Sequence, residues 1–360
     1  MKICFIGQNL TNLILATVFA EKNLNIDFFI SNKIKNPKTN RTIAISAENF
    51  KYLKNLSDFS LPAWKTEEIK IYVEDLKSKE IINFKKKNKE AFNLLSYSKL
   101  NEIFLNKIQK SKLINFTKLN TSSSLILNKI KNYDLVINTE SKNIISKKYF
   151  TNKITKNYKS YAYTFTINHK KINNYTASQI FTKYGPIAFL PFSKTNTSVV
   201  FSCIGKQKNN EEILKLFKKY NFIYNVNKTG IPEKFELNFS MLRNYTYKNI
   251  LAFGDIIHRV HPLAGQGFNM TIRDIKILSK IIQERTNLGL PIDSSVAYEF
   301  QKSTKHLNYL YGKAIDGIYE FFKLDSAFHN SISKPIFSIL NKNQIFKKYS
   351  NIFSDEGLNF

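Results

Sequence analysis

Residues 250–269, with the sequence ILAFGDIIHRVHPLAGQGFN, decide the fold of this chain. The first four residues form a short apolar run, which is typical of a strand buried inside a parallel sheet. Gly254 ends the run, and Asp255 follows at the carboxyl end of the strand, where parallel sheets bind ligands. Three of the chain's 11 glycines fall within residues 254–269, and glycines gather where a backbone turns tightly or approaches a ligand. The stretch therefore predicts a ligand-binding turn between a strand and a helix.

The second half of this stretch would suit a ligand that carries negative charge. Pro262 stiffens the turn, and Gly265 and Gly267 open a helix whose first N–H groups are left bare. The N-terminus of a helix stabilises negative charge, and a reduced flavin carries such charge at its N1–C2=O edge. Asp255 can accept hydrogen bonds from hydroxyl groups such as those of a ribityl chain.

Two other interpretations of the stretch compete with a flavin site. It could be a plain connecting loop, or His258-x-x-His261 could bind zinc. A zinc site needs further ligands at a suitable spacing, which the chain lacks, so we expect no metal.

The surrounding sequence predicts a parallel sheet. Residues 3–6 form a buried strand, residues 10–21 an apolar-faced helix and residues 26–30 a second strand. A strand, a helix and a strand within thirty residues make a βαβ unit. Residues 134–137 and 250–253 are two more apolar runs of the same kind.

The middle of the chain has a different pattern. From residue 158 to residue 203, apolar and polar residues alternate between turns, which indicates antiparallel strands with one covered face. We expect residues 69–73 and 81–84 to join this sheet. After residue 269 the chain becomes helical, with a long helix over residues 296–322.

Composition narrows the possible classes of protein. The chain has 360 residues, of which 43% are hydrophobic, and a net charge of +28. Lysines are spread throughout the chain together with many Asn and Ile residues. The codons of all three are AT-rich, so drift in base composition could explain most of the charge. We expect the lysine-rich run at residues 85–89 to be a solvated loop. No nucleic-acid-binding module is evident, and we expect no nucleic-acid partner. Two cysteines exclude a disulfide framework, and no apolar stretch is long enough to span a bilayer.

Residues 254–269 resemble the third flavin motif of class A flavoprotein monooxygenases, in the form Gly-Asp-x-x-His-x-x-His-Pro-x-Ala-Gly-Gln-Gly-x-Asn of the ubiquinone-biosynthesis hydroxylase branch. Arg41-x-x-Ala44-x-Ser46 resembles an early segment of that branch. Phe181-x-x-x-Gly185-Pro186-x-Ala188-x-Leu190-Pro191 resembles its strand on the substrate side of the flavin.

The resemblance implies an α/β fold with a Rossmann-like FAD-binding domain of the para-hydroxybenzoate hydroxylase type. An antiparallel β-sheet substrate domain would be inserted in it, and the C-terminus would be helical. We assign residues 1–68, 90–155 and 242–290 to the FAD-binding domain, residues 69–89 and 156–241 to the substrate domain, and residues 291–360 to the helical region.

The resemblance also implies a reaction. Reduced FAD would react with molecular oxygen to give a C4a-hydroperoxide, which hydroxylates an electron-rich aromatic ring, here that of a polyprenylated ubiquinone precursor. The cofactor supplies this chemistry, and the protein positions and shields it. No second Gly-x-Gly-x-x-Gly exists, so NAD(P)H would dock transiently or another protein would donate the electrons.

Individual roles carry over from the family's motifs. Asp255 would hold the ribityl chain, Arg41 would lie beside the diphosphate or the mobile flavin, and Leu190 and Pro191 would border the substrate. His258 and His261 could act as bases, although packing or hydrogen bonding is the expected role of each. The predicted catalytic positions are Pro262, Gly265 and Gln266. The predicted cofactor-binding positions are Gly7, Arg41, Gly254, Asp255, Pro262, Gly265, Gln266, Gly267 and Asn269.

The chain departs from the family at the ADP end of the cofactor. Of the opening Gly-x-Gly-x-x-Gly only Gly7 remains, because Asn9 and Asn12 replace the other two glycines. Asn tolerates a left-handed backbone, which would preserve the turn at Asn9, whereas Asn12 would hold the helix farther from the strand. Ser31 and Asn32 stand where the family has an acidic ribose ligand. Residues 138–141, Asn-Thr-Glu-Ser, replace Gly-Ala-Asp-Gly.

Three functions therefore stay open. The chain could be a FAD monooxygenase with altered ADP contacts, a cofactor-free scaffold of a quinone-biosynthesis assembly, or another flavin enzyme acting on isoprenoid lipids, such as a reductase or epoxidase. For the first we expect a cytoplasmic protein, peripheral to the inner face of the membrane, with possible quinone-biosynthesis protein partners. Its basic surface and aromatic C-terminal helices suit anionic lipid, although core packing explains the aromatic residues equally well.

Overall fold

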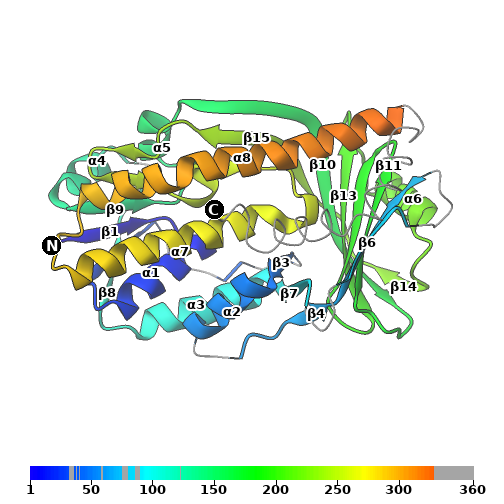
Figure 1. The fold of residues 1–360 in the computed structure, drawn as a ribbon, viewed down its shortest axis with the longest axis horizontal. Helices are drawn as coiled ribbons and strands as arrows, with labels where there is room; N and C mark the ends of the chain where they lie inside the picture. The colour runs from blue at the N-terminus through cyan, green and yellow to red at the C-terminus, as the bar shows by residue number, and fades with distance from the viewer. Residues whose placement is uncertain are drawn as a thin grey trace.

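The structure, a computed structural model, describes residues 1–31, 36–37, 39, 41–57, 60–74, 80–85, 90–121 and 123–327. Asn32, residues 86–89 of the lysine run and the C-terminal region from residue 328 lie outside these ranges. Figure 1 shows a parallel sheet with its helices at one end of the molecule and a large antiparallel sheet at the other. Two long helices, α7 and α8, lie side by side along the length of the molecule.

The first sheet has six strands in the order β16-β17-β9-β1-β2-β8. All neighbours pair in parallel except β16, which is antiparallel to β17. The predicted βαβ unit is confirmed residue for residue, but α1 is buried on every side through Phe19 rather than along one stripe, because α3 and α7 pack against it. The elements are β1 (Ile3–Ile6), α1 (Leu10–Glu21), β2 (Ile26–Ile30), β8 (Ile114–Lys118), α4 (Leu125–Lys129), η2 (Ile130–Asn132), β9 (Leu135–Asn138), α5 (Ile144–Tyr149), β16 (Thr246–Tyr247) and β17 (Ile250–Ala252).

The second sheet has nine strands, and α6 covers one of its faces through Ile213, Phe217 and Tyr220. The order is β18-β15-β10-β13-β12-β11-β5-β6, with β14 on β10. The predicted addition of residues 69–73 and 81–84 is confirmed, although β5 runs parallel to β11 within an otherwise antiparallel sheet. The elements are β5 (Glu68–Val73), β6 (Ile82–Lys85), β10 (Lys153–His169), β11 (Thr176–Thr182), β12 (Gly185–Pro191), β13 (Asn196–Ile204), α6 (Asn210–Tyr220), β14 (Val226–Thr229), β15 (Glu233–Leu242) and β18 (His258–Arg259).

A third, small sheet in the order β3-β7-β4 was not predicted from the sequence. It lies between the two larger sheets and is followed by helices that return to the parallel sheet (Figure 1). Its elements and their helices are β3 (Thr42–Ser46), α2 (Ala47–Ser57), β4 (Trp64–Thr66), β7 (Phe92–Ser96) and α3 (Tyr97–Lys110).

The last two helices join the sheets. After the turns η3 (Gly254–Ile256) and η4 (Leu263–Gly265), α7 (Gln266–Asn287) packs on the parallel sheet, and α8 (Ser294–Ala327) runs back along α7 to the nine-stranded sheet. There Phe322 stacks on Phe181 with 3.5 Å between ring centroids. The expected fold, a Rossmann-like domain with an inserted β-sheet and a helical C-terminal region, is confirmed. Within the described ranges, no helix has both the length and the apolar character needed to cross a membrane.

Candidate functional site

The carboxyl ends of three neighbouring parallel strands, β1, β9 and β17, meet at one edge of the first sheet. Ile6 is in register with Asn138, and Asn138 with Ala252, so the residues that follow β1, β9 and β17 emerge side by side. Gly254 has a left-handed φ of +62°, and a Cβ there would lie 3.1 Å from the Thr11 side chain of α1. The fold thus brings the predicted residues Gly7 and Gly254 to the edge where parallel sheets bind ligands.

The N-terminus of α7 is open. Gly265, its N-cap residue, has a left-handed φ of +69°, and a Cβ there would lie 3.1 Å from the Cβ of Ala44 in β3. No described side chain hydrogen-bonds to this end as a cap, and its first turn contains no acidic residue. The first N–H groups of a helix have no partner inside the helix, so Gly267 and Phe268 present theirs together with the positive end of the helix dipole. This end suits the anionic edge of a flavin.

Side-chain hydrogen bonds hold this open end from behind. The amide of Asn269 donates to Ala44 O (3.0 Å) and accepts from Ser46 N (2.9 Å), which ties α7 to β3. The Tyr311 hydroxyl on α8 donates to Gln266 Oε1 (2.6 Å), and burial raises the pKa of Tyr311 to about 12, which keeps the hydroxyl protonated at neutral pH. Asn269 and Gln266 therefore position the turn through their side chains, which leaves the backbone N–H groups of α7 for a ligand. Tyr311 had no sequence signal linking it to Gln266.

Asp255 and Arg41 each lie near Tyr97, a residue that the sequence did not single out. The Asp255 side chain is exposed at the end of β17, and the Arg41 guanidinium lies 5.4 Å from the ring centroid of Tyr97. Burial raises the pKa of Tyr97, opposed by Arg41 and by a hydrogen bond to the Leu10 backbone, while Asp255 adds to the increase. Tyr97 thus joins both predicted residues to the first residue of α1.

His258 is buried in a hydrogen-bonded network. Its Nε2 lies 2.8 Å from Asp274 Oδ2, which also accepts a hydrogen bond from Asn308 (3.2 Å). Arg273 donates to Asn308 in turn. The network connects β18, α7 and α8, which confirms the expected hydrogen-bonding role of His258.

His261 is packed between aromatic rings. It stacks on Tyr319 at 4.1 Å between centroids and meets Tyr158 edge-on at 5.3 Å. Burial lowers the pKa of His261 to about 3, so the ring is neutral at physiological pH. The packing role expected of His261 is confirmed. Among the described residues, no three His, Cys, Asp or Glu side chains gather as metal ligands would.

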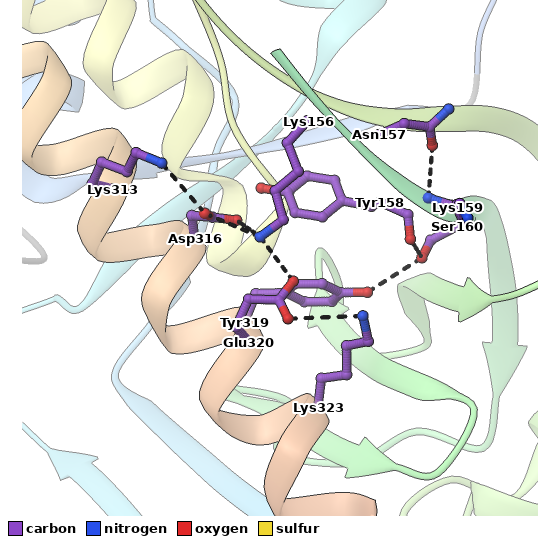
Figure 2. A network of polar contacts seen from close by, with 10 residues as sticks. All are labelled: Lys156, Asn157, Tyr158, Lys159, Ser160, Lys313, Asp316, Tyr319, Glu320 and Lys323. Carbon is purple, nitrogen blue, oxygen red and sulfur yellow. Dashed lines mark hydrogen bonds and ion pairs between the residues drawn. The ribbon is translucent and has the colours of Figure 1, made fainter. Parts of the chain in front are cut away.

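Figure 2 shows the polar contacts that fix α8 to β10 beside Tyr158 and Tyr319. Lys156 of β10 bonds to Asp316 (3.0 Å) and Glu320 (3.0 Å) of α8, and the hydroxyls of Ser160 and Tyr319 lie 3.2 Å apart. The loop that carries His261 and Pro262 is therefore packed beneath a helix that is anchored to the nine-stranded sheet.

Leu190 and Pro191, predicted to border the substrate, end strand β12 and are buried. Leu190 belongs to an apolar cluster with Ala44, Phe92 and Leu94. Because Ala44 lies against Gly265, this cluster connects the predicted substrate residues to the start of α7. Their contact with a substrate stays a prediction.

The N-terminus of α1 differs from that of α7 because its own side chains close it. Asn9 has an extended backbone (φ −101°), so the predicted left-handed turn at Asn9 is wrong. The extended conformation lets the Asn9 side chain accept from Asn12 N (3.1 Å) and donate to Thr139 O and Oγ1 (3.0 Å each). The fully buried Asn12 amide donates to Gly7 O at 2.8 Å. Gly7 itself is required because a Cβ there would lie 2.6 Å from Thr139 Oγ1.

The residues predicted to lie beside the ribose of ADP are also hydrogen-bonded within the protein. The Ser31 hydroxyl lies 2.9 Å from that of Thr121, which donates to Glu140 Oε2 at 3.1 Å. The described residues therefore fit the flavin ring at the α7 end, whereas at the α1 end these polar groups are already hydrogen-bonded to one another.

Comparisons with known proteins agree with this site. A model of the FAD binding domain matches residues 188–287, which include the whole turn from Gly254 to Asn269. The chain is 33% identical over 108 residues to the mitochondrial ubiquinone biosynthesis monooxygenase COQ6 of Dictyostelium discoideum, covering 30% of this chain and 22% of the relative. It is 24% identical over 184 residues to the ubiquinone hydroxylase UbiL of Rhodospirillum rubrum, covering 48% and 42%. These matches span less than half the length of each relative.

The fold is shared with solved flavoprotein structures. The p-nitrophenol 4-monooxygenase PnpA of Pseudomonas putida superposes with a TM-score of 0.76 at 10% identity, over 98% of this chain and 97% of that one. In the motif at residues 254–269, the matched FAD binding domain and these relatives, the chain is similar to class A flavoprotein monooxygenases of the ubiquinone-biosynthesis branch.

Proposed function

We propose that the protein is a FAD-dependent monooxygenase that hydroxylates the aromatic ring of a polyprenylated ubiquinone precursor. The observation that carries the proposal is the uncapped N-terminus of α7 beside Asp255 at the carboxyl edge of the parallel sheet. The named activities of its relatives support the substrate class. When bound, FAD would supply the oxygen chemistry: one oxygen atom of O2 is inserted into a ring C–H bond, and the other leaves as water after taking up two electrons from a donor and two protons.

The chain's own residues would bind and orient the flavin. The Asp255 carboxylate would accept hydrogen bonds from ribityl hydroxyls, and the N–H groups of Gly267 and Phe268 would stabilise negative charge at the flavin N1–C2=O edge. Pro262 would border the face that reacts with oxygen, and Arg41 would lie beside the phosphates. Leu190 and Pro191 would border the ring to be hydroxylated, where their apolar surface excludes water.

The substrate class implies access from a membrane surface. The solvent-facing side of α8 carries large hydrophobic side chains, with the exposed Lys302 and Lys313 between them. Such a face fits peripheral binding to anionic lipid, where apolar groups insert and lysines meet headgroups. The exposed hydrophobic residues of this face are Tyr298, Tyr309, Leu310, Ile318 and Leu324.

The proposal is tested with purified protein, FAD, an electron donor and a prenylated phenol. We expect a product heavier by one oxygen atom, with the label of 18O2 incorporated, and accumulation of the unhydroxylated precursor in cells that lack the protein. A normal quinone pool in those cells would contradict the substrate, whichever flavin the protein holds. NAD(P)H and a reduced protein donor are compared as the source of electrons.

A second candidate, a cofactor-free scaffold of a quinone-biosynthesis assembly, is favoured by the closed N-terminus of α1. The two functions differ in a simple observation. A protein that remains colourless after incubation with FAD and gel filtration, and shows no flavin binding by titration, would be a scaffold.

A further inference from the structure

At the N-terminus of α1, two of the backbone donors that a phosphate could use, those of Leu10 and Asn12, are engaged by side chains. Asn9 Oδ1 accepts from Asn12 N at 3.1 Å, and the Tyr97 side chain interacts with the backbone of Leu10. Helix N-termini bind phosphate through such free N–H groups. A diphosphate would have to displace both side chains, so the hydrogen bonds that it forms would replace others of similar strength.

The neighbouring strand ends add to this closure. The hydroxyls of Ser31 and Thr121 are hydrogen-bonded to each other, and Thr121 donates to the Glu140 carboxylate. The Glu140 side chain also lies against Gly7, with its Cβ 3.3 Å from the position of a Gly7 Cβ. The Glu140 carboxylate, which stands where the family has Asp, already accepts the hydrogen bond from Thr121. Both the phosphates and the ribose of a dinucleotide would therefore meet groups that are already hydrogen-bonded to other residues.

The N-terminus of α7, by contrast, keeps its donors free of side-chain caps, and Asp255 beside it is exposed. We infer that the protein selects its cofactor at the flavin and ribityl end alone, so that the ADP half of FAD adds little to binding and riboflavin, FMN and FAD bind with similar affinity. The inference rests on the proposed function, because it assumes that a flavin occupies the α7 end. It assigns Asn9 and Ser31 as the residues that remove selectivity for the dinucleotide.

The test is a flavin-fluorescence titration of the full chain with riboflavin, FMN and FAD. We expect the three dissociation constants to lie within about fivefold of one another. This limit is the increase in affinity that an ion pair between the exposed Arg41 guanidinium and a phosphate can give. FAD binding more than about 30-fold tighter than riboflavin would overturn the inference and leave the proposed function intact. Failure of all three flavins to bind would overturn the proposed function itself.

A pair of matched variants locates the effect. Asn9→Gly removes the side chain that caps α1, and we expect it to raise the preference for FAD over riboflavin by about tenfold. Asn209→Gly makes the same change at the N-cap of α6, which covers the nine-stranded sheet, and should leave the preference unchanged. Glycine is tolerated at N-caps, and thermal melting followed by circular dichroism checks that both variants fold. An unaltered preference in Asn9→Gly would overturn the role of Asn9.

Discussion

The helices α1 and α7 each begin beside the carboxyl edge of the parallel sheet, but their N-termini are built in opposite ways. The Asn9 side chain caps α1, whereas α7 starts at a left-handed glycine without a side-chain cap. A side-chain cap stabilises a helix by about 1 kcal/mol and engages donors that a ligand could otherwise use. The uncapped end of α7 therefore coincides with the proposed flavin site, whereas at α1 the side-chain cap stabilises the helix itself.

The open end is nevertheless rigid. Asn269 ties it to β3, Tyr311 ties Gln266 to α8, and the His258–Asp274 pair holds the strand before the turn against α7. A site that is fixed before its ligand arrives loses less conformational entropy on binding. The following changes test this contrast between a supported open end and a self-capped closed end.

The largest effect is expected from removing the support behind α7. Asp274→Ala would leave His258 and Asn308 with unpaired polar groups in the core, and we expect the free energy of unfolding to fall by about 3 to 5 kcal/mol. Urea denaturation measures it. Glu284→Ala, on the same helix, breaks only the exposed pair with Lys280 and should cost less than about 0.5 kcal/mol. Equal losses in the two variants would contradict a buried support.

Acid is expected to lower the free energy of unfolding through His261, in the turn before α7. The pKa of His261 is about 3 in the folded protein, against an ordinary value of 6.5, so the unfolded chain takes up a proton that the folded chain refuses. The contribution of the buried, neutral His261 ring to the free energy of unfolding is fully present above about pH 6.5 and is lost as the pH falls towards 3. Between pH 7 and pH 5 we expect the wild type to lose about 2 kcal/mol more than His261→Phe, since the remaining groups titrate alike in both. Parallel pH profiles of the two proteins, measured by urea denaturation, would show that His261 is protonated in the folded state.

Gly265→Ala tests the open end directly. Gly265 and Gly289 both have left-handed φ values, so alanine strains either site by about 1 kcal/mol. Only at Gly265 does the new Cβ meet another residue, Ala44, whereas nothing lies within 4 Å at Gly289. We expect at least a tenfold loss of flavin affinity, about 1.4 kcal/mol, in Gly265→Ala and none in Gly289→Ala. If the two variants bind flavin equally, the start of α7 is not the flavin site.

Tyr311→Phe removes one hydrogen bond behind the turn. We expect flavin affinity to fall about fivefold, in line with about 1 kcal/mol for the bond to Gln266. Because burial raises the pKa of Tyr311 to about 12, this loss should be the same at pH 6 and pH 9. Tyr309→Phe, whose side chain is exposed on the same helix, serves as the control and should bind flavin as the wild type does.

The smallest effect is expected at the closed end. Ser31→Ala should change FAD affinity by no more than about twofold, because the Ser31 hydroxyl is already bonded to Thr121 and offers little to a ribose. A tenfold weakening in the same fluorescence titration would mean that Ser31 binds the cofactor and that the closed end opens on binding.

The sequence predicted the elements with strong local patterns. Strands β1 and β2 and helix α1 have the predicted bounds, because buried parallel strands and the helix between them leave a pattern within thirty residues. The hydrogen-bonding role of His258 and the packing role of His261 were also foreseen. The predicted domain limits and ligand contacts of the individual site residues stay predictions.

Contacts between distant parts of the chain could not be predicted. Nothing in the sequence pairs Tyr97 with Leu10 or Tyr311 with Gln266, since both pairs depend on how helices pack in space. The expectation for Asn9 failed for a related reason. Its tolerance of a left-handed backbone was considered, but its ability to cap α1 while bonding to Thr139 became decisive once β9 lay beside β1.

The most direct measurement of the contrast is backbone hydrogen exchange with and without FAD. We expect FAD to slow exchange at Gly267 and Phe268, at the start of α7, and to leave the amides of Leu10 and Thr11 in α1 nearly unchanged. Equal protection of both helix ends would contradict the account, because it would show that the closed end binds the dinucleotide as the open end binds the flavin.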